Sequence, residues 1–259
     1  MTWLDSLLFL ALMWSADILI LIALVFLLAG FVKGVVGFGL PTVALALLAA
    51  TIEVKAAIAL LFVPALATNI WQALIGDSLL ALLRRLWSFL LPISIAIWFG
   101  AGVLARTEAS LITAILGLLL CAYGVATLAK VRIAEPGRRE VWLSPLVGAV
   151  NGIVTGLTGT FVVPSVIYLQ ALKLPRDALI QAMGLTYMVS SLMLGVALGG
   201  HGLLDAEIGL VSGLALVPAL LGMGLGQSLR KRLPEERFRQ VFLAAVILLG
   251  LYLVLRQLF

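Results

Sequence analysis

Long runs of hydrophobic residues recur along the whole chain, separated by short polar stretches. Charge-free runs of spanning length cover residues 56–76, 86–105, 109–129, 141–172, 178–204 and 208–229, with a shorter run over 240–255 and a run over 18–52 that contains a single lysine. A helix of about 20 residues crosses the ~30 Å hydrocarbon core of a bilayer. The pattern predicts an all-α polytopic membrane protein with about eight hydrophobic segments.

Two of these segments are interrupted by glycine and proline at corresponding places in the two halves of the chain. Residues 30–41 read Gly-Phe-Val-Lys-Gly-Val-Val-Gly-Phe-Gly-Leu-Pro, and residues 148–164 read Gly-Ala-Val-Asn-Gly-Ile-Val-Thr-Gly-Leu-Thr-Gly-Thr-Phe-Val-Val-Pro. Paired interrupted segments are typical of secondary transporters, whose substrate sites form where membrane helices break. The two interruptions therefore indicate where the site lies.

Basic residues between the segments predict which loops face the cytoplasm. Lys and Arg gather around Arg84, Arg138 and Arg230, whereas the loop that carries His201 has no basic residue. Cytoplasmic loops of membrane proteins are enriched in Lys and Arg. The first three loops should therefore face the cytoplasm, and the His201 loop should face outward.

The number of segments between these loops predicts a re-entrant hairpin. From Arg138 to His201 the chain passes two segments, 141–172 and 178–199, and yet it changes sides. The simplest solution is that 141–172 enters the membrane and turns back at its Gly/Thr-rich middle, which is tolerable where the backbone is buried in protein or lines a wet cavity. If 18–50 behaves likewise, each half has an odd number of crossings and the halves are inverted repeats. The competing interpretation is eight plain spans with parallel halves.

We expect one membrane domain over residues 1–259, built from two homologous halves. The first repeat covers 1–130, a cytoplasmic linker covers 131–141, and the second repeat covers 142–259.

Charged residues make up 11% of the chain, against about 25% in soluble domains. The formal charge of +5 comes from basic clusters between segments, which indicate membrane topology rather than binding of nucleic acid.

Matching positions in the two halves support a duplication. Lys33 falls opposite Asn151, and the polar pair at 68–69 falls opposite the polar pair at 190–191. Both halves thus place a glycine-broken segment before a helix with polar residues about half-way along it.

The residues near the breaks suit an anion. Helices that end inside the membrane present free N–H groups and the positive end of the helix dipole, and Ser, Thr, Asn and Gln side chains add further donors. The candidate substrate-binding residues are Lys33, Gly34, Gly37, Gly39, Asn69, Asn151, Gly152, Thr155, Gly156, Thr158, Gly159, Thr160, Gln181, Ser190 and Ser191. The alternative for any single glycine is close packing of membrane helices.

Lys33 has two interpretations of its own. An ionisable residue within the membrane is costly and marks a functional site, where its partner would be the anion or the dipoles of the second glycine segment. The alternative is a snorkelling anchor whose ammonium reaches an interface.

The two motifs together resemble the sulfite exporter TauE/SafE family. The resemblance rests on residues 33–41 and 152–164, followed by Tyr-Leu-Gln at 168–170 and Gln-Ala-Met-Gly at 181–184, and it covers nearly the whole chain. It implies a multi-pass protein of the bacterial inner membrane, made of two halves, that moves sulfite, sulfonates and related sulfur-containing organic anions.

We therefore expect a secondary transporter, and specifically an exporter, that holds a small sulfur-containing anion at the helix breaks and works by alternating access. The alternatives are an anion channel and a carrier of a non-sulfur organic anion. An enzyme is not expected, because the chain has one His and one Cys and no acid pair inside a span, and neither a metal nor a cofactor is expected. The expected partners are the anion and the lipid bilayer, and coupling to a proton or another ion and a homo-oligomer are compatible with this interpretation.

Overall fold

The computed structural model describes residues 14–129, 134–230 and 235–258. Every regular element within these ranges is a helix, and eight helices there are long and apolar enough to cross a membrane. The predicted all-α polytopic fold is therefore confirmed. Some predicted regions lie partly outside the described residues: the first repeat at residues 1–13, the linker at residues 131–133 and the C-terminus at Phe259.

Each half of the chain contributes a comparable series of helices. The first half contains α2 (Ala16–Val36), α3 (Leu40–Ala49), α4 (Val54–Leu60), α5 (Phe62–Leu74), α6 (Leu79–Arg106) and α7 (Ala109–Leu128). The second contains the 3-10 turn η1 (Gly137–Arg139), α8 (Glu140–Thr158), α9 (Ser165–Ala171), α10 (Arg176–Gly200), α11 (Ala206–Arg230) and α12 (Glu235–Leu258). Helices satisfy their backbone hydrogen bonds internally, as a chain in lipid requires.

The first long helix of each half ends at a glycine. Gly37 follows α2 with a φ of 91°, and Gly159 follows α8 with a φ of 71°. The Gly37 N–H donates to the Lys33 carbonyl and the Gly159 N–H donates to the Thr155 carbonyl, each at 2.7 Å. This left-handed cap favours glycine because a Cβ would collide with the backbone. The glycines therefore fix where both helices stop.

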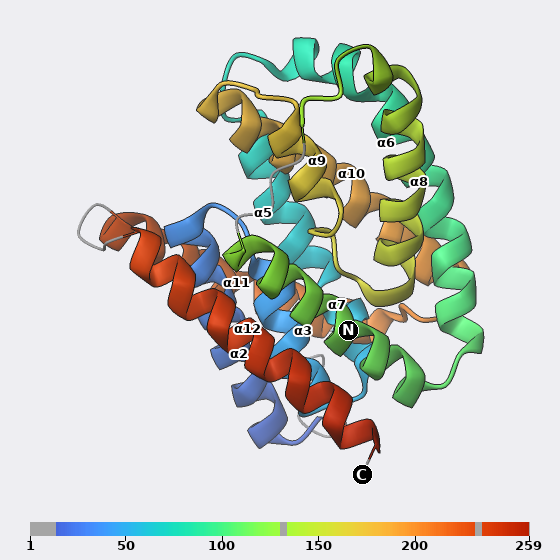
Figure 1. Cartoon of the computed structure of the whole chain (residues 1–259). Helices are drawn as coiled ribbons and strands as arrows, with labels where there is room; N and C mark the ends of the chain where they lie inside the picture. Colours follow the sequence, from blue (N-terminus) through green and yellow to red (C-terminus); the bar gives the residue numbers. More distant parts are fainter. Residues whose placement is uncertain (1–13, 130–133, 231–234, 259) are drawn as a thin grey trace.

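After each interruption the chain turns back. Helix α9 runs antiparallel to α8 and returns toward the end of the molecule at which α8 begins (Figure 1), where the hydroxyls of Ser144 in α8 and Tyr168 in α9 are hydrogen-bonded. Helix α3 likewise packs back against α2. The chain therefore turns back after both breaks. Because Ala16–Val36 and Gly137–Thr158 are each long and apolar enough to cross a membrane, re-entrant hairpins in 141–172 and 18–50 stay a prediction.

The helices join two ends of the molecule, which we call the inner end and the outer end. At the inner end α6 and α8 begin, and Arg85 of α6 pairs with Glu140 of α8. At the outer end α2 and α11 begin, and the Trp14 indole N–H donates to the Glu207 carboxylate at 2.6 Å.

Basic residues gather at the inner end. The described ones there are Arg84, Arg85, Arg138, Arg139, Lys173, Arg176, Arg230, Arg237 and Arg239. Acidic residues outnumber basic ones at the outer end, which carries Asp17, Glu53, Lys55, Arg106, Glu108, Asp205, Glu207 and Arg256. The structure places the Arg138 loop at the inner end and the His201 loop at the outer end, on opposite sides as expected. By the positive-inside rule the inner end is predicted to face the cytoplasm, and this sidedness stays a prediction.

Corresponding helices of the two halves run in opposite directions. Helix α2 begins at the outer end, whereas α8 begins at the inner end. The helix contacts show the same exchange of the two halves. Helix α6 packs on α8, and its counterpart α11 packs on α2, the counterpart of α8. Helix α7 packs on its own counterpart α12, and α5 packs on α10. This arrangement agrees with inverted halves. The duplication itself and the repeat boundaries stay predictions.

Candidate functional site

The side chain of Lys33 lies inside the bundle. It belongs to the last turn of α2 and is 5% exposed. Its ammonium donates to the Thr68 hydroxyl at 3.1 Å and to the side-chain oxygen of Asn69, both in the middle of α5 and both buried. Because the ammonium points toward α5 rather than toward an interface, its position argues against a snorkelling anchor.

The charge of Lys33 has only neutral partners in the described residues. No carboxylate among them lies within ion-pair distance of the ammonium, and two of its three N–H groups are used by Thr68 and Asn69. Within the same residues, no group of three His, Cys, Asp or Glu side chains could hold a metal ion. A buried cation without a counter-charge is costly, and an anion bound beside it would remove that cost.

A cavity of about 330 Å³ lies between Lys33 and Arg230, near the inner end. Its polar lining comes from Lys33, Thr68, Gln72, Gln227 and Arg230, on helices α2, α5 and α11. Its apolar lining includes residues of the same helices. The cavity is thus formed between the two halves and carries two cationic side chains, which is an arrangement suited to a small anion.

Four of these lining residues were not among the sequence candidates: Thr68, Gln72, Gln227 and Arg230. For two of them, Thr68 and Gln72, the sequence spacing could have indicated a place in the site. Thr68 and Gln72 are four residues apart in α5, so their side chains share one face of a helix that is mostly apolar apart from them and Asn69. The contribution of α11 depends on its packing against α2, which the sequence does not reveal.

Asn69 links the Lys33 site to the second half of the chain. Its amide nitrogen donates to the Ser191 hydroxyl at 3.3 Å, and that hydroxyl donates to the Tyr187 carbonyl at 2.7 Å. The structure therefore brings together Lys33, Asn69 and Ser191 among the predicted site residues. Ser190 is buried beside Ser191 on α10.

The predicted threonines of the second break bond within the break itself. Thr155 donates to the Thr160 carbonyl at 2.9 Å, and the Thr158 and Thr160 hydroxyls lie 2.9 Å apart. Asn151 accepts the backbone N–H of Ser165 at 3.1 Å. These contacts hold the turn between α8 and α9, while a direct contact of these side chains with substrate stays a prediction.

Three predicted glycines lie at close helix contacts. A Cβ on Gly34 would lie 2.3 Å from the Met223 carbonyl oxygen of α11, and one on Gly156 would lie 2.3 Å from the Ile97 carbonyl oxygen of α6. Gly152 meets α6 one turn earlier, with its Cβ position 2.5 Å from a carbonyl oxygen. Packing accounts for these three glycines.

The remaining predicted glycines lie at the breaks. Gly37 lines the cavity, and no atom lies within 4 Å of its Cβ position. Gly39, with a φ of 102°, precedes α3 and faces the ring of Phe242, whereas Gly159 faces Ile58.

Gln181 has a structural role in the connection between α5 and α6. Its amide nitrogen donates to the carbonyls of Ala73 and Gly76, at 2.9 and 3.1 Å, and its oxygen accepts the Ser78 N–H at 3.1 Å. The side chain thereby satisfies three backbone groups at the inner end.

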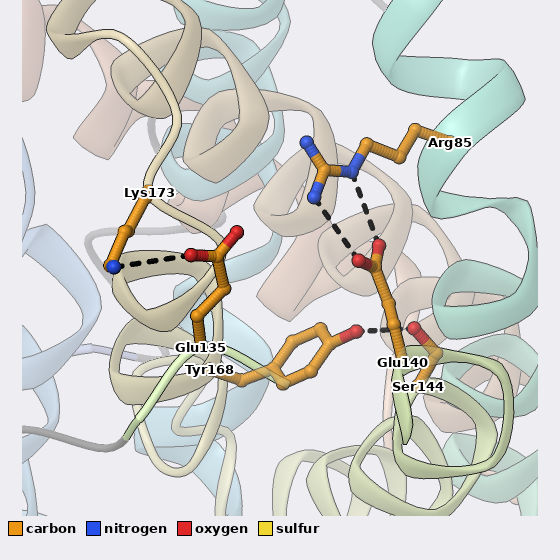
Figure 2. Close-up of polar contacts among 6 residues, drawn as sticks. All are labelled: Arg85, Glu135, Glu140, Ser144, Tyr168 and Lys173. Atoms are coloured by element: carbon orange, nitrogen blue, oxygen red, sulfur yellow. Dashed lines mark hydrogen bonds and ion pairs between the residues drawn. The ribbon is translucent and has the colours of Figure 1, made fainter. Parts of the chain in front are cut away.

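A polar network holds the α8–α9 hairpin against α6 at the inner end (Figure 2). The Arg85 guanidinium forms a two-pronged contact with Glu140, with both N···O distances at 3.1 Å. The Tyr168 hydroxyl meets Ser144. Lys173 pairs with Glu135 at 3.1 Å beside them. The Arg85–Glu140 pair thus links α8 to α6, while the other two contacts join parts of the second half to one another.

Comparison with known proteins gives one finding. The family model described as sulfite exporter TauE/SafE matches residues 22–253. No curated protein and no solved structure matches the chain significantly. The match covers both hairpins, the Lys33 cavity and nearly all of the membrane-spanning helices. This multi-pass membrane protein thus belongs to the sulfite exporter TauE/SafE family of transporters.

Proposed function

We propose that this protein is a secondary carrier that exports a small sulfur-containing anion, such as sulfite or an organosulfonate, across the bacterial inner membrane. The observation that carries the proposal is the Lys33 ammonium, which is buried at the end of a cavity with neutral partners only. An anion in the cavity would supply the charge that balances it. Family membership supports transport of such an anion.

The cavity matches the chemistry of a sulfite or sulfonate group. Such a group presents several oxygens, which can accept hydrogen bonds from Lys33 and from the Gln227 amide, with Arg230 supplying a second positive charge nearer the inner end. Trp71 and Ile75 add apolar surface that suits the short hydrocarbon part of an organosulfonate. The volume of about 330 Å³ is at the lower end for ligand sites, which favours a small solute.

The lining of the Lys33 cavity includes no residue of the outer end, and the separate cavity of about 280 Å³ between α2, α3 and α12 is lined by apolar side chains only. Helix α3 returns from the break to the outer end, and its Leu40, Leu45 and Leu48 have no exposed surface. A channel needs a path open at both ends, whereas a carrier exposes its site to one side at a time. Alternating access is therefore the mechanism that we propose, with the Lys33 cavity reached from the inner end.

The proposal can be tested with purified protein in two assays. Ligands that bind the native state raise its melting temperature, so sulfite, sulfate, thiosulfate, taurine, sulfoacetate and their carboxylate analogues can be compared. We expect sulfite or a sulfonate to raise the melting temperature most. Equal stabilisation by a carboxylate analogue would favour a non-sulfur organic anion instead.

Flux in proteoliposomes separates the carrier from a channel. We expect saturable transport of the anion that continues against its own gradient when an ion gradient is imposed. A coupled carrier would be contradicted if the anion never accumulates beyond the equilibrium set by its own gradient and the membrane potential.

A further inference from the structure

The second half of the bundle contains a cluster of buried polar groups that the Lys33 cavity does not use. In the described part of the chain, no hydrogen-bond partner is found for the Asn151 amide nitrogen or for the hydroxyls of Thr186, Tyr187 and Ser190. Tyr187 is 3% exposed, and the other three residues have no exposed surface. Buried polar groups in folded proteins are nearly always hydrogen-bonded to protein, water or a ligand, so these groups call for a polar partner that the described residues do not supply.

The groups lie around the break between α8 and α9. The Asn151 side-chain oxygen accepts the Ser165 N–H at 3.1 Å, so the amide nitrogen points away from the α9 backbone. Within the break, the Phe161 ring lies 6.1 Å from the Tyr187 ring, measured between centroids. The Tyr187 hydroxyl lies beside the Ser165 side chain, outside the geometry of a regular hydrogen bond. Asn151 and Tyr187 therefore approach the same region from α8 and α10.

This region corresponds in the second half to the Lys33 site in the first. In the aligned halves Asn151 falls opposite Lys33, and Ser190-Ser191 fall opposite the pair that ends in Asn69. The Lys33 ammonium is hydrogen-bonded to that pair, whereas the Asn151 amide nitrogen and the Ser190 hydroxyl have no partner among the described residues. The bond from Asn69 to Ser191 joins the two regions directly.

We propose that Asn151, Tyr187 and Ser190 form a second, uncharged binding site for the transported oxyanion. This inference rests on the proposed function of the Lys33 cavity. Amide and hydroxyl groups can donate to the same oxygens that Lys33 would hold, but they do so without a full positive charge. An anion transferred from Lys33 to this site is therefore held less tightly and can leave the protein, as transport requires.

The contacts at the inner end favour this order of events. The Arg85–Glu140 pair links α8 to α6, and the Ser144–Tyr168 bond links α8 to α9 (Figure 2). In the described state these contacts lie between the second site and the inner end. The Lys33 cavity, in contrast, reaches Arg230 at that end. The anion therefore meets Lys33 first, and the second site serves the outward-facing state.

The double variant Tyr187→Phe with Ser190→Ala tests the second site, because it removes two hydroxyls and almost no volume. The matched control is Tyr252→Phe with Ser94→Ala, which removes an exposed phenol hydroxyl and a hydroxyl bonded to its own helix. The measurements are the Kd for sulfite of the purified protein and the maximal rate of sulfite flux in proteoliposomes. We expect the double variant to keep its Kd within twofold of the parent and to lose at least fivefold in maximal rate. The control should change neither quantity.

Unchanged flux in the double variant would overturn the second site and would mean that water satisfies these groups. A Kd weakened more than fivefold would also overturn it, because the hydroxyls would then belong to the Lys33 site. If the double variant is not monodisperse, Tyr187→Phe and Ser190→Ala are measured singly against the same criteria. A parent protein that binds no sulfite would instead contradict the proposed function, so the two failures are distinguishable.

Discussion

At the scale of single residues, the arrangement around Lys33 is built to leave a charge unbalanced. Its partners Thr68 and Asn69 are neutral acceptors, and both come from a helix with no acidic residue. A carboxylate at either position would neutralise the ammonium internally and remove the reason for an anion to bind. The neutral amide of Asn69 therefore leaves the Lys33 ammonium able to bind an anion.

Asn69→Asp tests this consequence. The new carboxylate would form an ion pair with Lys33 and compete with the substrate anion, so we expect sulfite to bind at least tenfold more weakly, a loss of about 1.4 kcal/mol. Gln170→Glu is a matched control, because it makes the same amide-to-carboxylate change at an exposed position of α9. Calorimetric titration of sulfite measures both. An Asn69→Asp protein that binds as the parent does would show that Lys33 is not the counter-charge.

At the scale of helices, the glycines of the two interrupted segments divide into two kinds. Gly37 and Gly159 end helices in a left-handed conformation, whereas Gly34, Gly152 and Gly156 let neighbouring helices touch. The sequence predicted the interruptions, because glycine clusters followed by proline are incompatible with one continuous helix. It did not distinguish the two kinds, because closeness to α6 or α11 is a property of the tertiary packing.

Gly156→Ala should therefore weaken the contact between α8 and α6. The added Cβ would lie 2.3 Å from a backbone oxygen, which forces the helices apart. We expect a loss of stability of about 1–3 kcal/mol, as for overpacking elsewhere. Gly213→Ala on α11 is the control, since no atom lies within 4 Å of its Cβ position, and it should be neutral or slightly stabilising. Thermal unfolding in detergent compares them, and equal melting temperatures would contradict the packing role of Gly156.

At the scale of the whole molecule, the segment lengths and loop charges were enough to predict the all-α bundle and the turn back in the second half. Hydrophobic length and charge bias act on each segment separately, so a single sequence carries them. The cavity could not be predicted in the same way, because its walls combine Thr68 and Gln72 with Gln227 and Arg230 from the other half. Likewise, nothing local reveals that Gln181 bonds to the α5–α6 connection.

The orientation of the halves makes a prediction about the C-terminus. Helix α12 ends at the outer end, where Arg256 donates to the Ala50 carbonyl at 2.7 Å. A reporter that matures only in the cytoplasm should therefore stay dark when fused after Phe259. The same reporter inserted into the basic loop at 130–136 should be bright and serves as the control. A bright fusion at Phe259 would contradict inverted halves.

The role of Lys33 is tested most directly by the Kd for sulfite of the Lys33→Met and Lys33→Arg proteins at fixed pH. Methionine keeps much of the length and removes the charge, so we expect binding to weaken at least tenfold, or about 1.4 kcal/mol. Arginine keeps the charge with a different shape and should retain part of the affinity. Binding by Lys33→Met within about threefold of the parent would contradict the proposal that the buried ammonium is the counter-charge of the transported anion.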